Sequence, residues 1–383
     1  MKKKNSPKKI LTKTVIALVV FFSIVSCAKQ EDYPSFPSQS SDPIVNFDAF
    51  WVGINDNYVF FPYDNVNWDD VYNAYRPKVT SGTSNDDLKD ILLEMLSKLI
   101  DGHSLIKIGA SNYGTTDPDY DIKHPRIYFD AIVFSTYIAN NRYFNLFTYK
   151  EGKDTLVEFY TANLRKHPNT AYIRYFKFQN ALENESQNAT FNAYLSQIET
   201  ENFDALILDL RSNGGGLATS FKNLVSKFVP SNYTWGYSKF RLGRDRYEMT
   251  PFLEEKIAFA GTTIYTKPLV ILTDRYSFSG AELTVLALRN LPNVTIIGDT
   301  TGGAQGPIYP ADAPNGGLDK DFTGNFKMPN GWIVQLAQKS SFDSEKNIFE
   351  GTGIPPDRLA IQSQTLAANG IDNVLEAAID FLY

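Results

Sequence analysis

One serine lies where an apolar run gives way to a helical pattern. Residues 268–273 are rich in Val, Ile and Leu and predict a buried strand, and residues 280–291 carry apolar residues at helical spacing. Ser279 is therefore predicted at a helix N-terminus, where backbone N–H groups lack partners and the amide of Gly280 could stabilise an oxyanion. The alternative is that Ser277 and Ser279 are only N-caps.

Three consecutive glycines form a second candidate element. Gly214, Gly215 and Gly216 follow a predicted buried strand at 204–210 and precede a helical pattern at 218–229. Glycines in this position allow positive φ and expose backbone amides, so the loop is typical of an anion or oxyanion cradle. A phosphate loop is disfavoured because no Lys-Ser/Thr pair follows the glycines, and the dinucleotide-binding spacing is absent.

Considered together, these segments resemble the S41 family of serine peptidases, which includes carboxyl-terminal processing and tricorn-like proteases of the crotonase-like fold. DGHSL and the residues upstream of it resemble the helical N-terminal part of the tricorn-like branch. The matching segments are DGHSL at 101–105, DLRSNGGG at 209–216, DRYSFSGAE at 274–282, IIGDTTGG at 296–303 and FEGTGIPPD at 349–357. The resemblance extends from about residue 47 to the end of the chain.

The resemblance implies a serine nucleophile with a separate base, because a serine hydroxyl is a weak nucleophile at neutral pH. In the processing branch the base is a lysine, and an ungapped count from Ser279 places Ala304 at that position. The tricorn-like branch instead uses a histidine with a glutamate. This implies His103 as the general base, with an ordinary pKa near 6.5, and Glu350 as the carboxylate that orients it.

Other side chains near these motifs leave alternatives open. Asp101 or Glu282 could take the place of the orienting carboxylate, and Ser104 is a possible second orienting group. Glu282 could also be no more than a favourable charge in the first turn of a helix. His124 and His167 each precede a proline in a polar loop, so we interpret them as structural.

The oxyanion hole is expected from backbone amides of the two loops. One donor is expected from Gly280 and another from Gly214 or Gly215, with Asn213 and Arg211 shaping the glycine loop. The loss of one such donor typically costs about a hundredfold or more in turnover. No cofactor and no metal are expected for this chemistry.

The N-terminus resembles a lipoprotein signal. Residues 1–26 carry six lysines, then an uncharged run from 14 to 26 that is too short to span a bilayer, and Cys27 follows. Cys27 is therefore expected to be acylated. It is the single cysteine of the chain, so no intramolecular disulfide can form. Residues 27–44 are charged and then rich in Pro and Ser, as expected of a flexible tether.

The charge of the mature protein excludes one class of partner. Removal of the six signal lysines leaves 31 Lys and Arg against 43 Asp and Glu, a net charge of about −12. This balance argues against nucleic acid as a partner. The expected location is the bacterial cell envelope, with a lipid anchor that favours the outer membrane, facing either the periplasm or the surface.

The fold class expected is α/β. A crotonase-like core of ββα units is expected over 171–383, because strand and helix patterns alternate there. A helical subdomain similar to the tricorn C1 domain is expected over 45–105, and a β-rich insertion over 106–170. The insertion lacks the carboxylate-binding loop of a PDZ domain, so capture of substrate C-termini by such a domain is not expected.

The expected function is a serine endopeptidase or a carboxyl-terminal processing-type peptidase that acts through an acyl-enzyme at Ser279 on a peptide or protein substrate. Two alternatives belong to other classes. One is a catalytically silent protein that binds lipids or peptides on the same scaffold. The other is an esterase, which is disfavoured because the G-x-S-x-G elbow is missing around Ser279.

Overall fold

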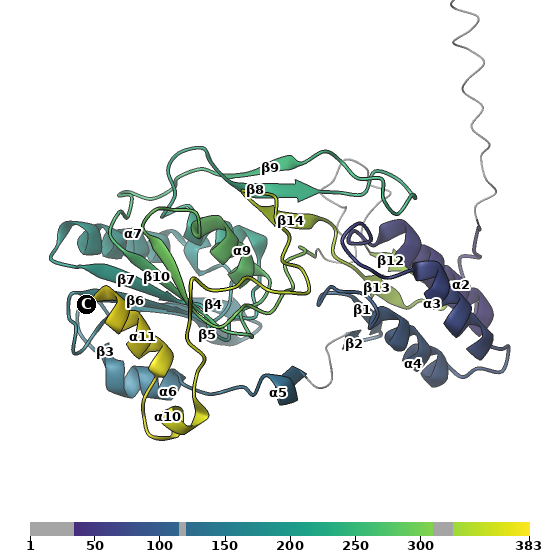
Figure 1. Cartoon of the computed structure of the whole chain (residues 1–383), viewed down its shortest axis with the longest axis horizontal. Helices are drawn as coiled ribbons and strands as arrows, with labels where there is room; N and C mark the ends of the chain where they lie inside the picture. Colours follow the sequence, from purple (N-terminus) through teal and green to yellow (C-terminus); the bar gives the residue numbers. More distant parts are fainter. Residues whose placement is uncertain (1–33, 115–119, 309–324) are drawn as a thin grey trace, which may run out of the picture. The chain divides into compact units, whose positions relative to one another are not determined.

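The computed structural model describes residues 34–114, 120–308 and 325–383 (Figure 1). The expected signal peptide, Cys27 and the first part of the expected tether lie outside the described residues. The described residues from 39 onward form one compact unit. The predicted nucleophile, base, carboxylate and oxyanion-hole residues all lie within this unit.

Three capped helices begin the unit. Asp42, Asn67 and Ser84 each accept a backbone N–H in the first turn of the helix that follows, which satisfies a donor that has no partner inside the helix. Phe47 and Leu92 are fully buried between the helices. The helices are α2 (Pro43–Asn57), α3 (Trp68–Tyr75) and α4 (Asn85–Leu96), with a 3-10 turn η1 (Arg76–Lys78) after α3.

A four-stranded antiparallel sheet packs against these helices and includes two distant parts of the chain. Met328, Trp332 and Val334 lie in the same hydrophobic cluster as the helices. The helical part therefore buries its apolar faces on residues more than 200 positions later in the sequence. The strand order is β12 (Phe326–Lys327), β13 (Ile333–Gln335), β1 (Leu105–Ile108) and β2 (Ser111–Gly114).

An eight-stranded mixed sheet forms the larger layer. Its strand order is β15 (Arg358–Leu359), β11 (Val294–Gly298), β10 (Leu269–Thr273), β7 (Ala205–Asp209), β6 (Thr170–Tyr175), β5 (Asp154–Leu164) and β3 (Ile138–Ala139), and β4 (Asn145–Glu151) also pairs with β5. The strands from β15 to β6 are parallel, whereas β5 is antiparallel to its neighbours. The predicted strands at 204–210 and 268–273 are confirmed as β7 and β10.

Helices cover both faces of this sheet (Figure 1). Leu206 and Leu208 of β7 lie in the cluster with α7, α8 and α9, whereas Ile207 lies in the opposite cluster with α11 and η2. This alternation follows from the two-residue period of a strand, and burial on both sides explains the continuous apolar runs. The helices are α5 (Tyr120–Lys123), α6 (Asp130–Ile132), η2 (Val133–Tyr137), η3 (Ala181–Glu183), α7 (Glu185–Thr200), α8 (Ala218–Val225), α9 (Gly280–Leu288), α10 (Gln364–Ala368) and α11 (Asn373–Leu382).

A three-stranded sheet lies beside α9 and reaches the helical part. Its order is β14 (Ser340–Asp343), β8 (Tyr233–Lys239) and β9 (Leu253–Ile257). Phe342 of β14 packs edge-on against Tyr63, which follows α2, with ring centroids 5.4 Å apart. Phe342 and Tyr63 therefore connect this sheet to the helical part.

Three parallel strands end at the same edge of the large sheet. β7, β10 and β11 are in parallel register and end at Asp209, Thr273 and Gly298. β7 continues into the glycine loop, β10 continues into the turn before Ser279, and β11 continues into the end of the IIGDTTGG segment. Ligand sites in parallel sheets lie at this carboxyl edge, so the fold brings the three loops to one place.

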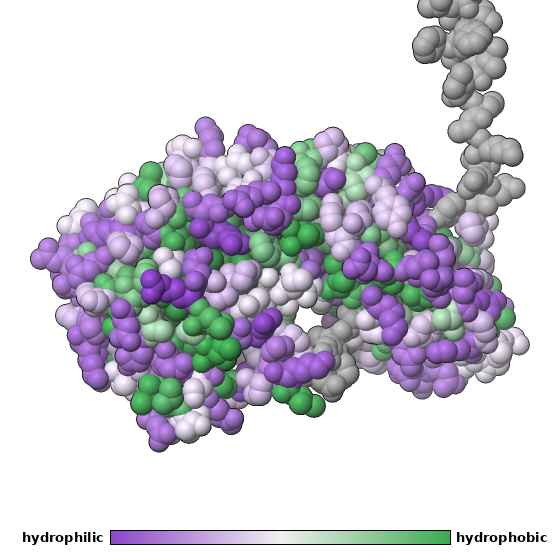
Figure 2. Space-filling view, in the orientation of Figure 1, coloured by the Kyte–Doolittle hydropathy of each residue, from purple (hydrophilic) through white to green (hydrophobic). Residues whose placement is uncertain are grey.

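Several exposed apolar side chains gather in the C-terminal segment. Figure 2 shows apolar surface over the region of α10, and Leu359, Ile361, Leu366 and Ile371 are all exposed. No helix among the described residues combines the length and the apolarity needed to cross a bilayer.

Candidate active site

Ser279 occupies the N-cap of α9 in an unusual backbone conformation. Its φ is 53° and its ψ is −115°, whereas an N-cap normally lies in the β region. Positive φ is uncommon for a residue with a side chain, and such strain, of order 1–3 kcal/mol, concentrates at functional sites. Ser279 is partly exposed, so its hydroxyl can meet a substrate. The conformation favours display of the hydroxyl over a purely capping role.

The glycine loop packs directly against this serine. Gly215 has φ +89°, and a Cβ built on it would lie 2.6 Å from the Cβ of Ser279 and 2.7 Å from the N of Gly280. No side chain fits there. The absence of a side chain lets two backbone segments meet at the nucleophile, which is the arrangement that an oxyanion hole needs.

Not every predicted donor is available. The N–H of Gly215 donates to Asn213 Oδ1 at 2.8 Å. The amide N–H groups of Gly214 and Gly280 have no hydrogen-bond partner within the described part of the chain. Between the two glycines that the sequence left open, Gly214 is therefore the better candidate donor beside Gly280.

Asn213 holds the loop in place, as expected. Its Nδ2 donates to the carbonyl of Tyr175 at 2.9 Å, and its own carbonyl accepts the N–H of Phe278 at 2.9 Å. Phe178 N–H donates to the carbonyl of Gly215 at 2.8 Å. These bonds connect the glycine loop both to β6 and to the turn before Ser279.

Glu282 connects Ser279 to residues 301–304, a role that the sequence did not predict. Its buried carboxylate accepts the N–H of Ser279 at 3.1 Å and the N–H groups of Gly303 and Ala304, both at 2.8 Å. Thr301 Oγ1 donates to it at 2.6 Å. Burial raises the pKa of Glu282, and these donors partly offset the increase. A glutamate three residues after an N-cap serine was the available signal, because it is the spacing of a capping box.

Ala304 lies between the nucleophile and the DGHSL turn. The carbonyl of Ala304 accepts the N–H of Ser279 at 3.0 Å. A Cβ built on Gly102 would lie 3.0 Å from the Cβ of Ala304. Ala304 is therefore next to Ser279, in agreement with the ungapped count. An alanine at this point offers no base, so the base has to come from elsewhere.

His103 lies in a turn that Asp101 fixes. Asp101 is buried and accepts the N–H groups of His103 and Ser104 at 2.9 and 2.8 Å, and the hydroxyl of Ser104 at 2.7 Å. His103 is partly exposed, but its Nδ1 is buried without a hydrogen-bond partner. Burial lowers the pKa of His103 to about 4. The imidazole is therefore neutral at pH 7 and able to accept a proton.

Glu350 lies in an adjacent turn. A Cβ on Gly351 would lie 3.1 Å from the carbonyl of Ile100, so this turn packs against the start of DGHSL. Glu350 Oε2 accepts the N–H groups of Gln305 and Gly306 at 2.8 and 2.9 Å, while its buried Oε1 has no partner. Burial, followed by the nearby carboxylates of Asp101 and Glu282, raises the pKa of Glu350 well above its ordinary value.

The structure thus brings the predicted loops together without closing a hydrogen-bonded triad. His103 Nδ1 and Glu350 Oε1 are two enclosed polar atoms on adjacent turns, and each lacks a partner within the described residues. Buried polar atoms of this kind need an explanation. Catalytic hydrogen bonds are often long in a free enzyme and shorten when substrate binds, so this arrangement is compatible with a triad.

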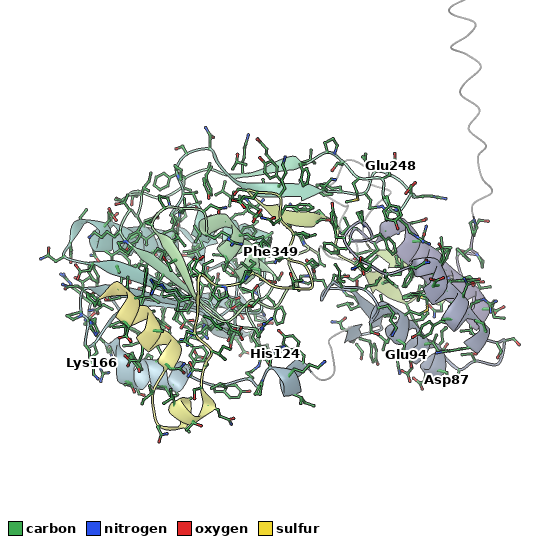
Figure 3. The ribbon with its side chains drawn as sticks, viewed as in Figure 1. Asp87, Glu94, His124, Lys166, Glu248 and Phe349 are labelled. Carbon is green, nitrogen blue, oxygen red and sulfur yellow. The ribbon has the colours of Figure 1, made fainter. Side chains whose placement is uncertain are left out.

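The other two histidines have structural surroundings. Figure 3 shows His124 at the end of the segment that holds α5, one residue beyond the helix, and its carbonyl accepts the hydroxyl of Tyr276 at 2.5 Å. The His167 ring stacks on Tyr383, with centroids 4.9 Å apart. Neither ring makes a described contact with Ser279.

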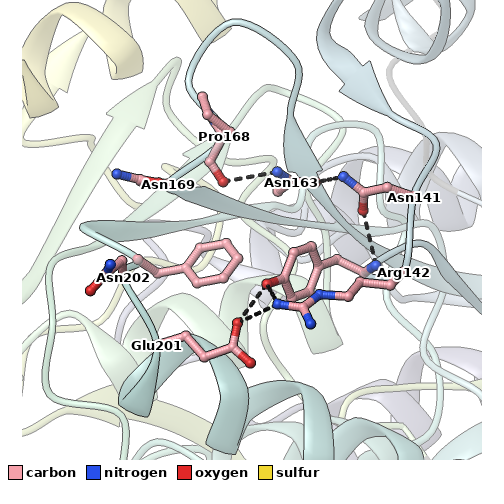
Figure 4. A pocket seen from close by; sticks show the side chains of 9 residues that line it. Asn141, Arg142, Asn163, Pro168, Asn169, Glu201 and Asn202 are labelled. Atoms are coloured by element: carbon pink, nitrogen blue, oxygen red, sulfur yellow. Dashed lines mark hydrogen bonds and ion pairs between the residues drawn. The ribbon is translucent and has the colours of Figure 1, made fainter.

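A polar groove lies elsewhere in the unit (Figure 4). It is open, with a volume of about 570 Å³, and contains none of the predicted catalytic residues. Most polar groups on its floor bond to one another: Asn141 Nδ2 donates to Asn163, and Arg142 and Tyr143 both donate to Glu201. These groups already satisfy each other, so they offer little to a polar ligand.

Comparison with known proteins assigns the family. Residues 169–360, half of the chain, match peptidase family S41, and residues 42–97 match the tricorn protease C1 domain. The protein belongs to peptidase family S41. The expected crotonase-like fold is confirmed by its structural neighbours.

Relatives with curated descriptions are matched over part of their length. The chain is 28% identical to a carboxyl-terminal-processing protease of Synechocystis sp. over 139 residues, which cover 36% of this chain and 29% of that protein. It is 23% identical to the nisin-resistance protein of Lactococcus lactis subsp. lactis over 202 residues, which cover 49% and 56%. The chain thus spans less than two thirds of these relatives.

Solved structures match over nearly the whole chain. A candidate peptidase from Parabacteroides merdae is 25% identical with a TM-score of 0.74, covering 90% of this chain and 97% of that one. The tricorn protease, at 15% identity and a TM-score of 0.52, covers 89% of this chain and 36% of its own length and shares the fold.

Proposed function

We propose that the protein is a serine-type peptidase that cleaves peptide bonds through an acyl-enzyme at Ser279. The observation that carries the proposal is the strained N-cap conformation of Ser279, against which the backbone of Gly215 packs with no room for a side chain. Two amides without partners, those of Gly214 and Gly280, flank the same residue. Membership of family S41 and similarity to carboxyl-terminal-processing proteases support the reaction class.

In the first step the Oγ of Ser279 bonds to the scissile carbonyl carbon, and its proton passes to His103. The carbonyl oxygen becomes an oxyanion that the amides of Gly280 and Gly214 stabilise. The C–N bond then breaks as His103 returns the proton to the leaving amine. Water, deprotonated by His103, attacks the acyl-enzyme, and collapse of the second tetrahedral adduct releases the acid and restores the hydroxyl.

Glu350 is proposed as the residue that orients His103. A proton on His103 creates a buried cation, which is costly without a counter-charge. An ionised Glu350 is equally costly alone, as its raised pKa indicates. The two charges on adjacent turns reduce each other's cost, so proton transfer from Ser279 to His103 is favoured when Glu350 can ionise.

Labelling with a fluorophosphonate tests this proposal. Wild-type protein is expected to react at one serine, and Ser279→Ala is expected to abolish both the label and peptide hydrolysis. Ser277→Ala is the matched control, because this neighbouring serine is buried and donates to the carbonyl of Leu210 at 2.9 Å. A folded wild-type protein that takes no label would favour the silent binding protein. A labelled protein that cleaves esters but no peptides would favour the esterase.

The domain boundaries and the substrate mode are also proposed. We propose a helical tricorn C1-like part at 45–105, a β-rich insertion at 106–170 whose strands β3, β4 and β5 extend the large sheet, and the peptidase core at 171–383. The sequence of residues 106–170 lacks the carboxylate-binding loop of a PDZ domain, so we propose that substrates bind as extended peptides beside Ser279 rather than by capture of their C-termini.

We further propose a lipid anchor at Cys27 in the cell envelope, with the outer membrane as its site. The signal-like residues 1–26 support the anchor, and similarity to a nisin-resistance protein supports an envelope location. Metabolic labelling with a palmitate analogue is expected to modify the wild-type protein but not Cys27→Ser. Label that persists in Cys27→Ser would contradict the anchor. Recovery of the protein in the inner-membrane fraction would contradict the outer-membrane assignment.

A further inference from the structure

A buried ion network lies beneath the glycine loop. We define it as Arg174, Asp209, Arg211 and Asp372, all at most 1% exposed, together with the half-exposed Asp130. Arg211 Nη2 donates to Asp209 at 2.6 Å, and its two Nη atoms donate to the two oxygens of Asp372, both at 2.8 Å. This bidentate fork is the strongest common geometry for an ion pair.

The network fixes the backbone at the start of the loop. Arg174 Nη1 donates to the carbonyl of Arg211 at 2.5 Å, and the N–H of Arg211 donates to Asp209 at 3.1 Å. The next residue, Ser212, has φ 55° and donates its N–H to Asp274 at 2.8 Å. The N–H and the carbonyl of Arg211 are therefore both fixed by hydrogen bonds, three residues before Gly214.

Asp372 reaches this point from the far end of the chain. It is the N-cap of α11, where its carboxylate also accepts the N–H groups of Val374 and Leu375 at 3.1 and 3.0 Å. It lies beyond residues 169–360, which match the peptidase family. Its contact with Arg211 therefore connects a C-terminal helix outside the matched region to the loop that carries the proposed oxyanion donor.

Stability alone is a weak reason for such a network. Removal of two charges from water costs about as much as their attraction returns, so buried ion pairs often add little net stability compared with apolar residues. A bidentate pair does, however, impose one geometry on both partners. An oxyanion hole needs that kind of geometric restraint, because its donors act only at hydrogen-bond distance from the developing charge.

We propose that Asp372 is a positioning residue for the reaction: through Arg211 it fixes the glycine loop so that the N–H of Gly214 faces the oxyanion. The inference rests on the proposed peptidase function. The Asp372–Arg211 pair would connect the start of α11 to the glycine loop and hold the proposed oxyanion donor in position.

Asp372→Asn tests the assignment against Glu376→Gln. Asparagine is also a good N-cap and has nearly the same size, so α11 keeps its start while Arg211 loses a counter-charge. Glu376 lies on the same helix and accepts the hydroxyl of Tyr137 at 2.6 Å without contacting Arg211. Both variants are assayed with an internally quenched peptide selected from a mixed-sequence library with the wild-type protein, and unfolding is followed by circular dichroism.

The expected result is a selective loss in turnover. Asp372→Asn should lower kcat about 10- to 100-fold with KM changed less than about threefold, whereas Glu376→Gln should change kcat less than about twofold. A peptide aldehyde of the same sequence adds to Ser279 as a tetrahedral hemiacetal, so its Ki should rise by the same factor as kcat falls. The Kd of the cleaved product peptide should stay constant.

Several outcomes would overturn the assignment. These are normal kcat in folded Asp372→Asn, a change confined to KM, and equal losses in the two variants. If Asp372→Asn does not fold, Arg211→Lys replaces it, since lysine keeps the charge but lacks the fork; normal kcat in folded Arg211→Lys would then overturn the proposal. An inactive, unlabelled wild type would refute the proposed function itself, whereas an active wild type with normal variants would refute only the role of Asp372.

Discussion

At the scale of single residues, the site depends on how burial shifts the proton affinities of its acid and base. His103 loses affinity for a proton and Glu350 gains it, because both would carry a charge away from water. Each group is therefore neutral more readily than in solution. The pH dependence of the reaction follows from these two shifts.

His103 should remain a proton acceptor to lower pH than an ordinary histidine. Only neutral His103 can accept the proton of Ser279, and its pKa is about 4 rather than 6.5. In Glu350→Gln, where position 350 cannot titrate, kcat/KM should stay nearly constant from pH 7 to about 5 and fall tenfold per pH unit below about 4. In the wild type, protonation of Glu350 should lower kcat/KM at a higher pH, because its pKa is raised. Rapid kinetics after pH jumps measure both limbs, and circular dichroism shows whether the protein is still folded. A midpoint near 6.5 in Glu350→Gln would contradict the burial of the base.

Glu350→Gln should make the protein more stable and less active. The folded state favours protonated Glu350, so its contribution to stability is lost as pH rises through the raised pKa. A neutral glutamine removes that loss, and its carbonyl can still accept the N–H groups of Gln305 and Gly306. We expect a higher Tm at pH 8 and roughly a 100-fold or greater fall in kcat. The exposed Glu345→Gln is the control, and a lower Tm in Glu350→Gln would refute the argument.

At the scale of elements, the proposed reaction should depend on two backbone segments in contact at Ser279. Gly215→Ala adds a Cβ 2.6 Å from the Cβ of Ser279 at a φ of +89°. The loop has to move, so we expect labelling and turnover to fall roughly 100-fold or more. Gly152→Ala is the matched control, because Gly152 has φ +61° but nothing within 4 Å.

Both glycine variants should lose about 1 kcal/mol of unfolding free energy from the backbone conformation alone. Chemical denaturation measures this common cost, so the difference in turnover reports the geometry of the site. Equal activities in the two variants would show that the contact between the loop and Ser279 is unimportant.

Sequence patterns were informative where the chemistry lies on local elements. The apolar run before Ser279 and the glycines after β7 predicted the strand-to-helix junctions correctly, because each depends on neighbours in the chain. Glu282 was named without its role as the acceptor for two distant amides. Asp372 was not singled out, because a pairing of residues 161 positions apart leaves no local periodicity.

At the scale of the whole molecule, the helical part depends on the second half of the chain for its core. Trp332 is buried against the helices, so Trp332→Ala should lower the unfolding free energy by about 3–5 kcal/mol. The change should also expose residues 43–97 to limited proteolysis. Tyr128→Ala, at an aromatic residue that is 83% exposed, should have little effect. Denaturation curves that do not separate these two variants would contradict the shared core.

This shared core also sets the order of events during synthesis. The strand that follows His103 ends at residue 108, but the residues that complete its sheet begin at 326. At about 5–20 residues per second, a ribosome needs roughly 10 to 40 seconds to make the intervening chain. Throughout that interval the proposed base lies beside a sheet that lacks two of its four strands. The proposed site can therefore be complete only after the strand that ends at residue 335 has been made.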